Sequence, residues 1–219
     1  MPKQTPLTVL VTGFEPFGGE RSNPSWEAVR SLQGLEIAKH RIETLCLPVE
    51  FHTSLRALRQ AISQCTPALV LCVGQAGGRA QLSLERVAIN IDDARIADNA
   101  GQQPIDAPII PDGPAAYFTT LPIKAMLLAL RHAGIPAEIS QTAGTYVCNH
   151  VFYGAMHALK GTCSARAGFI HIPFSPKQAA HHPGAPSLAA STIKKGLRIA
   201  IETALTTQHD ASIAAGAEH

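Results

Sequence analysis

Short apolar runs alternate along the chain with longer segments in which apolar residues recur every three or four positions. The first pattern predicts β-strands and the second predicts amphipathic helices. The strand-like runs are Leu7 to Thr12, Arg41 to Val49, Pro67 to Gly74, Leu82 to Asp92, Ala137 to Ser140 and Gly168 to Pro173. One helical segment begins near Asn23, and another begins shortly after Gly144 and lasts to about Lys160. The other helical segments are Phe51 to Gln64, Pro122 to His132 and Ser187 to Thr206.

This alternation predicts one α/β domain over residues 1–219, built as a three-layer α/β/α sandwich with a mostly parallel, mixed central sheet. Pro67 to Gly74 is apolar throughout, as expected for a parallel strand covered on both faces. An extended segment around Glu85 is expected to add an antiparallel piece. The tail from about residue 207 is small and polar, and we expect it to be frayed.

Two stretches depart from regular patterning. Ala94 to Ala116 holds four prolines and two glycines and predicts a long irregular segment. Phe14 to Gly19 places two aromatic residues in a Gly- and Pro-containing loop, just before Asn23 and Pro24. These last two residues are typical of a helix N-cap and of the first helical position.

Composition narrows the class of protein. The chain has 219 residues, 46% of them apolar and 16% charged, and its net charge of +2 comes without a clustered Lys/Arg stripe, which argues against a nucleic-acid partner. Apolar runs such as Ala68 to Val73 are far too short to cross a bilayer, and the first residues lack the apolar core of a signal peptide. Five cysteines without a CxxC spacing favour free thiols in a reducing cytosol. We therefore expect a small partner and no membrane contact.

Cys148 is the first candidate for chemistry. It follows the strand-like run at Ala137 to Ser140 and falls in the first turn of the next predicted helix. Backbone N–H groups and the helix dipole at that position stabilise a thiolate, so we expect a lowered thiol pKa. The competing interpretation is a buried cysteine that acts as a small hydrophobic residue.

His171 and Glu85 are the candidate partners of Cys148. His171 lies near the carboxyl end of a predicted strand, whereas most of the other histidines fall in loops, in the tail or near element ends. If Leu82 to Asp92 is one strand, Glu85 shares a face with Val87, Ile89 and Ile91, and a carboxylate among apolar neighbours needs a partner. A thiol, an imidazole and a third orienting group suit acyl transfer. An ion pair between Glu85 and Arg79, Arg86 or Arg95, or a core role for His171, stays open.

Metal and nucleotide sites are weaker interpretations. Cysteines and histidines of the types that bind zinc occur at Cys148, His150, His157, Cys163 and His171. Their spacing matches no usual zinc motif, and residues two apart on a helix do not face one another. The Gly18-Gly19 and Gly77-Gly78 pairs match neither a P-loop nor GxGxxG. We therefore expect no metal and no cofactor.

Several motifs resemble one family in chain order. Gly74-Gln75-Ala76-Gly77, followed by residues 82–90 (LSLERVAIN), strongly resembles the glutamate signature of pyroglutamyl peptidase I. Residues 142–149 (TAGTYVCN) resemble its cysteine signature. Residues 12–19 (TGFEPFGG), 23–26 (NPSW) and 169–173 (FIHIP) look like its other hallmark segments. The likeness extends from about Leu7 to Leu205, and several long motifs in register are more specific than any one of them.

The resemblance implies a cytosolic, cofactor-free cysteine peptidase that removes N-terminal pyroglutamate from peptides, commonly as a homotetramer. It implies Cys148 as nucleophile, His171 as base and then acid, and Glu85 as the group that orients His171. The residues that it implies near the substrate are Phe14, Phe17, Asn23, Gln75 and Arg95. An apolar pocket with few polar contacts suits the neutral lactam. A related hydrolase or phosphorylase acting on another small amide or nucleoside, and a non-catalytic binder, are the competing hypotheses.

Overall fold

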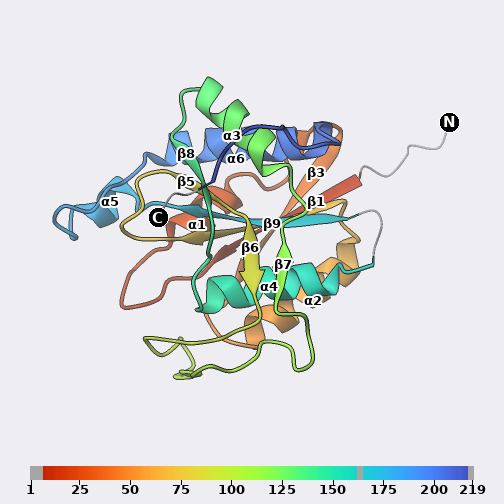
Figure 1. Ribbon diagram of the computed structural model, residues 1–219. Helices are drawn as coiled ribbons and strands as arrows, with labels where there is room; N and C mark the ends of the chain where they lie inside the picture. The colour runs from red at the N-terminus through yellow and green to blue at the C-terminus, as the bar shows by residue number, and fades with distance from the viewer. Residues whose placement is uncertain (1–6, 162–164, 217–219) are drawn as a thin grey trace.

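In the computed structural model, which describes residues 7–161 and 165–216, the strands form one large sheet and one small ribbon (Figure 1). The seven-stranded sheet has the order β2-β3-β1-β4-β9-β5-β8, and β6 pairs only with β7. The sheet strands are β1 (Leu7–Phe14), β2 (Glu36–Ile37), β3 (His40–Leu47), β4 (Leu69–Gln75), β5 (Leu82–Glu85), β8 (Ala137–Ser140) and β9 (Arg166–Ile172). The ribbon strands are β6 (Val87–Ile89) and β7 (Ala116–Phe118).

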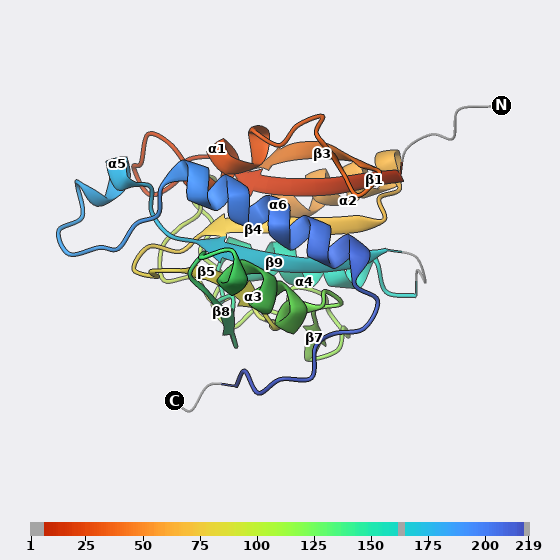
Figure 2. The same cartoon turned by 90° about the horizontal axis from the view of Figure 1, so that it is seen from above.

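The helices cover both faces of the sheet, as the three-layer prediction requires (Figures 1 and 2). They are α1 (Pro24–Arg30), α2 (Thr53–Cys65), α3 (Ile123–His132), α4 (Val147–Ala158), α5 (Pro176–Ala179) and α6 (Ala190–Thr206). One hydrophobic cluster joins α1, α3 and α6 to the sheet, and a second joins α2 and α4 to its other face. The fold class predicted from the sequence is confirmed.

The centre of the sheet is parallel and its far edge is reversed. β3, β1, β4 and β9 run parallel to one another, and β4 is buried over nearly its whole length because helices lie on both sides of it. β5 pairs antiparallel with β9 and parallel with β8. The antiparallel piece expected around Glu85 is therefore present. It brings the carboxyl end of β5 back past the strand that carries His171.

The predicted strand from Leu82 to Asp92 is wrong in its second half. The chain leaves the main sheet at Arg86, and residues 87–89 form β6 of the separate ribbon. Glu85 is fully buried as expected, but it does not share a strand face with Val87, Ile89 and Ile91. Period-two alternation continues through this change of sheet, so the sequence pattern could not reveal the break.

Helix α4 is buried on two sides. It packs on the central sheet, and β6 crosses its outer side, with β7 beside it (Figure 1). The Asn149 side chain joins the two layers by donating to the backbone oxygens of Ile89 and Ile91 and accepting from Ile89 N. A helix that is apolar nearly all round is expected in such a layer.

The C-terminal tail packs against the domain as far as Ala215, which corrects the expectation of fraying for these residues. The Asp210 carboxylate accepts hydrogen bonds from the backbone N–H groups of Lys124 and Ala125 in the first turn of α3. Ile213 and Ala215 pack against the first hydrophobic cluster, and Ala215 O accepts from Arg86. Composition alone could not reveal a cap that comes from residues more than eighty positions away.

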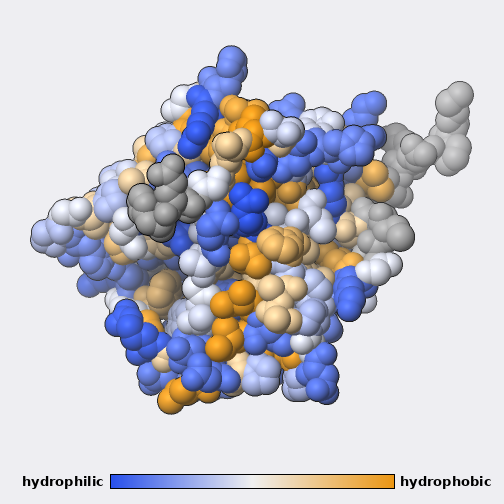
Figure 3. Space-filling model, in the orientation of Figure 1, coloured by the Kyte–Doolittle hydropathy of each residue, from blue (hydrophilic) through white to orange (hydrophobic). Residues whose placement is uncertain are grey.

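The surface is mostly polar with an apolar strip. In Figure 3 hydrophobic side chains gather in the middle of the face where Figure 1 places β6 and β7. Phe118 on β7 is 70% exposed and Ile105 is 76% exposed. Within the described ranges, no helix combines the length and the apolar character needed to cross a membrane.

Asp210→Ala tests the docking of the tail. Removing the carboxylate leaves two N–H groups at the start of α3 without this cap, so we expect a loss of about 0.5–2 kcal/mol in unfolding free energy. Denaturant unfolding monitored by circular dichroism measures it. His209→Ala, at an exposed neighbouring position, is the matched control, and equal stability of the two variants would contradict the capping role.

Candidate active site

Glu85 and His171 meet at the antiparallel junction of β5 and β9. The register pairs Ser83 with His171, so Glu85, two residues further along β5, lies on the same face of the sheet. His171 Nδ1 lies 2.7 Å from Glu85 Oε1, and both side chains are almost completely buried. An ionised carboxylate can only accept, so Nδ1 carries the proton. Nε2 is then left with its lone pair and can act as a base.

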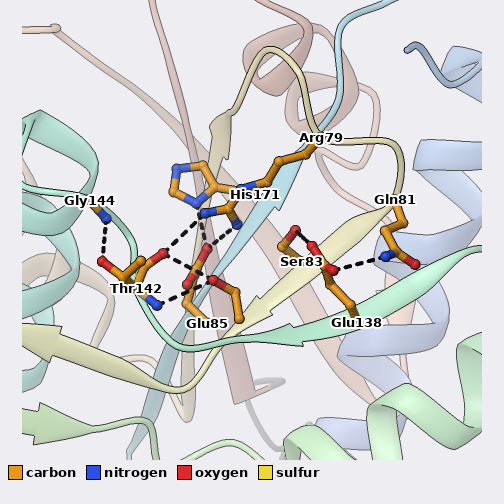
Figure 4. Close-up of polar contacts among 9 residues, drawn as sticks. Arg79, Gln81, Ser83, Glu85, Glu138, Thr142, Gly144 and His171 are labelled. Atoms are coloured by element: carbon orange, nitrogen blue, oxygen red, sulfur yellow. Dashed lines mark hydrogen bonds and ion pairs between the residues drawn. The ribbon is translucent and has the colours of Figure 1, made fainter. Parts of the chain in front are cut away.

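Arg79 shares the same carboxylate oxygen. Its Nη1 lies 2.7 Å from Glu85 Oε1, and its Nη2 donates to Thr142 O at 3.1 Å (Figure 4). The two partners weighed for Glu85 from the sequence, a histidine and an arginine, are therefore both present. Arg86 points elsewhere, toward Ala215, so of the three arginines considered Arg79 forms the ion pair.

Cys148 is the second residue of α4, as predicted, and its side chain is half-buried. Its Sγ lies against Gly74 at the carboxyl end of β4, where a Cβ would be 2.8 Å from the sulfur. Gly74 is the register partner of His171 on β9, and the Phe169 ring lies beside both. Only glycine at position 74 leaves room for the thiol at this end of the sheet.

Burial reverses the expected pKa shift of the thiol. It raises the pKa of Cys148 to about 12, the Glu85 carboxylate and Cys72 add to the rise, and Arg79 opposes it. This direction is opposite to the lowering expected from the helix N-terminus, because desolvation disfavours the charged thiolate. Burial also lowers the pKa of His171 below its usual 6.5, although Glu85 acts in the opposite direction. Near neutral pH both groups are uncharged at rest.

A small apolar pocket opens beside the sulfur of Cys148. It is lined by Phe14, Phe17, Asn23, Val49, Gln75, Tyr146, Val147 and Cys148. The Tyr146 ring packs against Phe17 and stands edge-on to Phe51, and its hydroxyl donates to Ala97 O. Tyr146 was not predicted, although it lies only two residues before the candidate nucleophile.

The expected substrate-contacting residues divide into three groups. Phe17 and Gln75 line the pocket with partly exposed side chains. Phe14 and Asn23 also line it but are nearly buried: Phe14 is the last residue of β1, and the Asn23 side chain caps α1 and donates to Glu15 O. Arg95 is exposed and does not belong to the lining, so its contact with substrate stays a prediction.

A family model described as pyroglutamyl peptidase matches residues 7–207. The chain belongs to the pyroglutamyl peptidase family. This is a family of cysteine peptidases, and the chain is an enzyme of that class. The resemblance drawn from the sequence motifs is confirmed.

Named relatives within this family cover almost the whole chain. Pyrrolidone-carboxylate peptidase 1 of Ralstonia nicotianae is 61% identical over 213 residues, which are 97% of this chain and 99% of that protein. The pyrrolidone-carboxylate peptidase of Escherichia fergusonii is 58% identical over 212 residues, with 97% and 99% covered. The crystal structure of pyroglutamyl peptidase I from Bacillus amyloliquefaciens superposes with a TM-score of 0.93 at 48% identity, covering 96% of this chain and 100% of that one.

The residues considered for zinc do not converge in this member of the family. His150 Nδ1 bonds to Asp92 and its Nε2 accepts from His52 N, while His157 bonds to the Tyr117 hydroxyl. Cys163 lies outside the described residues. Over residues 7–161 and 165–216 no three His, Cys, Asp or Glu side chains are grouped as a metal site requires.

Alkylation tests the protonation state of Cys148. Because the thiol pKa is raised to about 12, the labelling rate with iodoacetamide should climb about tenfold per pH unit from neutral pH to about pH 9. Peptide mapping measures the rate at Cys148, and Cys148→Ala identifies its signal. A rate that levels off below neutral pH would instead reveal a thiolate–imidazolium pair.

Proposed function

We propose that the protein hydrolyses the amide bond that follows an N-terminal pyroglutamyl residue of a peptide, through a thioester on Cys148. The observation that carries this proposal is the position of the Cys148 sulfur at a small apolar pocket, with the buried His171–Glu85 pair close by. Membership of the pyroglutamyl peptidase family supports it. The relatives named pyrrolidone-carboxylate peptidase support the same substrate.

The chemistry begins with both partners neutral. Nε2 of His171 takes the proton of the Cys148 thiol as the sulfur attacks the pyroglutamyl carbonyl carbon. Glu85 stabilises the imidazolium that forms. His171 then gives the proton to the departing amine, the C–N bond breaks and a thioester remains. Water, deprotonated by His171, hydrolyses the thioester to release pyroglutamate and restore the thiol.

The start of α4 suits the oxyanion of this reaction. Its N-cap residue, Tyr146, makes no side-chain capping hydrogen bond within the described part of the chain. The N–H groups of the first turn are therefore available, and they point out of the helix beside the sulfur. Fixed donors of this kind stabilise a developing negative charge without reorganisation.

Selectivity follows from the small polar content of the pocket. The lactam ring is neutral, and the Phe17 and Tyr146 rings offer it apolar walls. Gln178 Nε2 donates to Gln75 Oε1, which orients the Gln75 amide beside the pocket. A free amino terminus would place an unpaired ammonium there, and desolvating such a charge costs several kcal/mol. Open-chain N-terminal residues are thereby rejected.

We also propose, from the family resemblance, a cytosolic homotetramer. The exposed side chains of Phe118 and Ile105 support association between copies, because large apolar groups at a surface often mark contact sites. The absence of any cofactor from the reaction stays a prediction of the same resemblance.

A panel of fluorogenic substrates tests the function. We expect pyroglutamyl-coumarin to be cleaved, and prolyl- and alanyl-coumarin to be left intact, because the latter two carry a charged amino group. Cys148→Ser should reduce the rate to background, whereas Cys65→Ser, at a partly exposed thiol at the end of α2 and outside the pocket lining, is the matched control. Cleavage of all three substrates would indicate a broad aminopeptidase, and cleavage of none would indicate another substrate class or a binder.

Phe17→Ala tests the pocket wall. Loss of one apolar wall should lower kcat/KM for pyroglutamyl-coumarin by about 1–3 kcal/mol in transition-state terms. The melting temperature should change little, because Phe17 is half-buried at the edge of its cluster. An unchanged kcat/KM, or a loss that follows a collapse in melting temperature, would remove Phe17 from substrate recognition.

A further inference from the structure

We propose that Arg79 is a positioning residue that fixes the tautomer and protonation state of the Glu85–His171 pair. Its kinetic consequences rest on the proposed function. The proton positions that it assigns are those of the enzyme without substrate. It is carried by the shared contact on Glu85 Oε1 and by the second contact of Arg79 with the segment that leads into α4.

A tight turn after β4 brings Arg79 back over β5. The Arg79 N–H donates to Ala76 O, and Gly78 has a φ of +91°, which favours glycine. The Phe174 ring occupies the space where a side chain at Gly77 would lie. The glycine pair that matched no nucleotide motif therefore has a structural use, which is to return the chain so that Arg79 reaches a buried carboxylate.

Two donors on one oxygen restrict where the protons can be. Arg79 Nη1 and His171 Nδ1 each lie 2.7 Å from Glu85 Oε1, whereas Oε2 has no hydrogen-bond partner among the described residues. Arginine can only donate, so Oε1 must accept from it. A proton on Oε1 would leave the guanidinium beside a neutral carboxyl and weaken its hydrogen bond, which disfavours the arrangement in which Glu85 donates to Nδ1. With Glu85 ionised, Nδ1 carries the hydrogen and Nε2 is the free base.

Without Arg79 a second arrangement becomes more favourable. A buried carboxyl group can take up a proton and donate it to Nδ1, because both partners are then neutral. His171 would hold its hydrogen on Nε2 and could not accept the proton of the Cys148 thiol. The wrong tautomer is costly in hydrolytic triads.

Arg79 also links the histidine to the approach of the nucleophile. Its Nη2 donates to Thr142 O, which also accepts from the Ser140 hydroxyl (Figure 4). Thr142 Oγ1 in turn accepts from Gly144 N, three residues before α4 begins. The Arg79 guanidinium therefore bonds both to Glu85, the partner of His171, and to the segment that leads to Cys148. It helps to hold the imidazole and the sulfur at a fixed relative position.

The charges around His171 set the expected direction of a pH effect. Glu85 on β5 and Arg79 act on it in opposite senses, and Cys148 on α4 is uncharged at rest. Glu138 on β8 is the other acid on this face, but it is bound to Ser83 and Gln81. Loss of Arg79 should therefore raise the pKa of His171, and loss of the Glu85 charge should lower it.

The direct test is ¹⁵N NMR of the imidazole, which distinguishes a protonated from an unprotonated ring nitrogen without substrate. In the wild type we expect His171 with hydrogen on Nδ1 and a bare Nε2. Arg79→Ala should populate the Nε2–H form, and His171→Ala assigns the signals. An unchanged tautomer in Arg79→Ala would overturn the proposal, whatever substrate the enzyme proves to take.

The pH dependence of kcat/KM supplies a second test, because the two variants Arg79→Ala and Glu85→Gln should shift its acid limb in opposite directions. In Arg79→Ala the acid limb of kcat/KM should move to higher pH, with a fall of roughly 10–100-fold at neutral pH, as is typical for residues that orient a functional histidine. In Glu85→Gln the limb should move to lower pH, and kcat should fall by about 10²–10⁴. Arg86→Gln, which removes an equal charge next to Glu85 in sequence, should leave the limb in place.

Controls separate positioning from folding. Arg79 is 27% exposed, so guanidinium at sub-denaturing concentration should restore part of the activity of Arg79→Ala, and Arg79→Lys should keep the wild-type acid limb. Melting temperatures are measured on the same preparations. An activity loss explained by a smaller folded fraction, with the acid limb unmoved and no rescue, would show Arg79 to be a structural ion pair only. If the wild type does not cleave pyroglutamyl substrates, the proposed function is refuted. The NMR result then still decides whether Arg79 fixes the tautomer of His171.

Discussion

The buried carboxylate of Glu85 is the constraint on which the site depends. An ionised group without exposed surface must be neutralised and hydrogen-bonded where it lies, and here the Arg79 guanidinium and the His171 Nδ1–H meet one oxygen. The reversal of the sheet at β5 meets this need. The reversal lets a residue at the end of one strand meet His171 on the next, while the turn after β4 supplies the guanidinium.

The parallel part of the sheet serves the site in a different way. The β4 strand is buried and covered by helices on both faces, so its carboxyl end is held firmly where Gly74 leaves space for the sulfur. The helix that bears Cys148 is then held from outside by the β6–β7 ribbon through Asn149. Regular elements thus hold the nucleophile from the sheet and from the ribbon, while the irregular segment from residue 94 to 115 meets the start of the helix at Ala97 O, which accepts from the Tyr146 hydroxyl.

Much of this arrangement could be predicted from the sequence. The order of elements, the N-cap at Asn23, Cys148 at the start of a helix and His171 near a strand end all follow from local patterns. The break at Arg86 could not be predicted, because alternation says nothing about which sheet a strand joins. The expected direction of the thiol pKa shift was wrong for a related reason. The helix N-terminus is visible in the sequence, whereas the burial that raises the pKa depends on the packed fold.

The protonated resting state of Cys148 affects how the enzyme reacts with oxidants when no substrate is bound. Thiolates, not thiols, are the nucleophiles that attack peroxides and disulfides. Since burial keeps Cys148 protonated until His171 accepts its proton, the sulfur is a poor target for cellular oxidants while the pocket is empty. The same desolvation that makes the nucleophile slow to ionise thus protects it from sulfenic acid formation and from mixed disulfides.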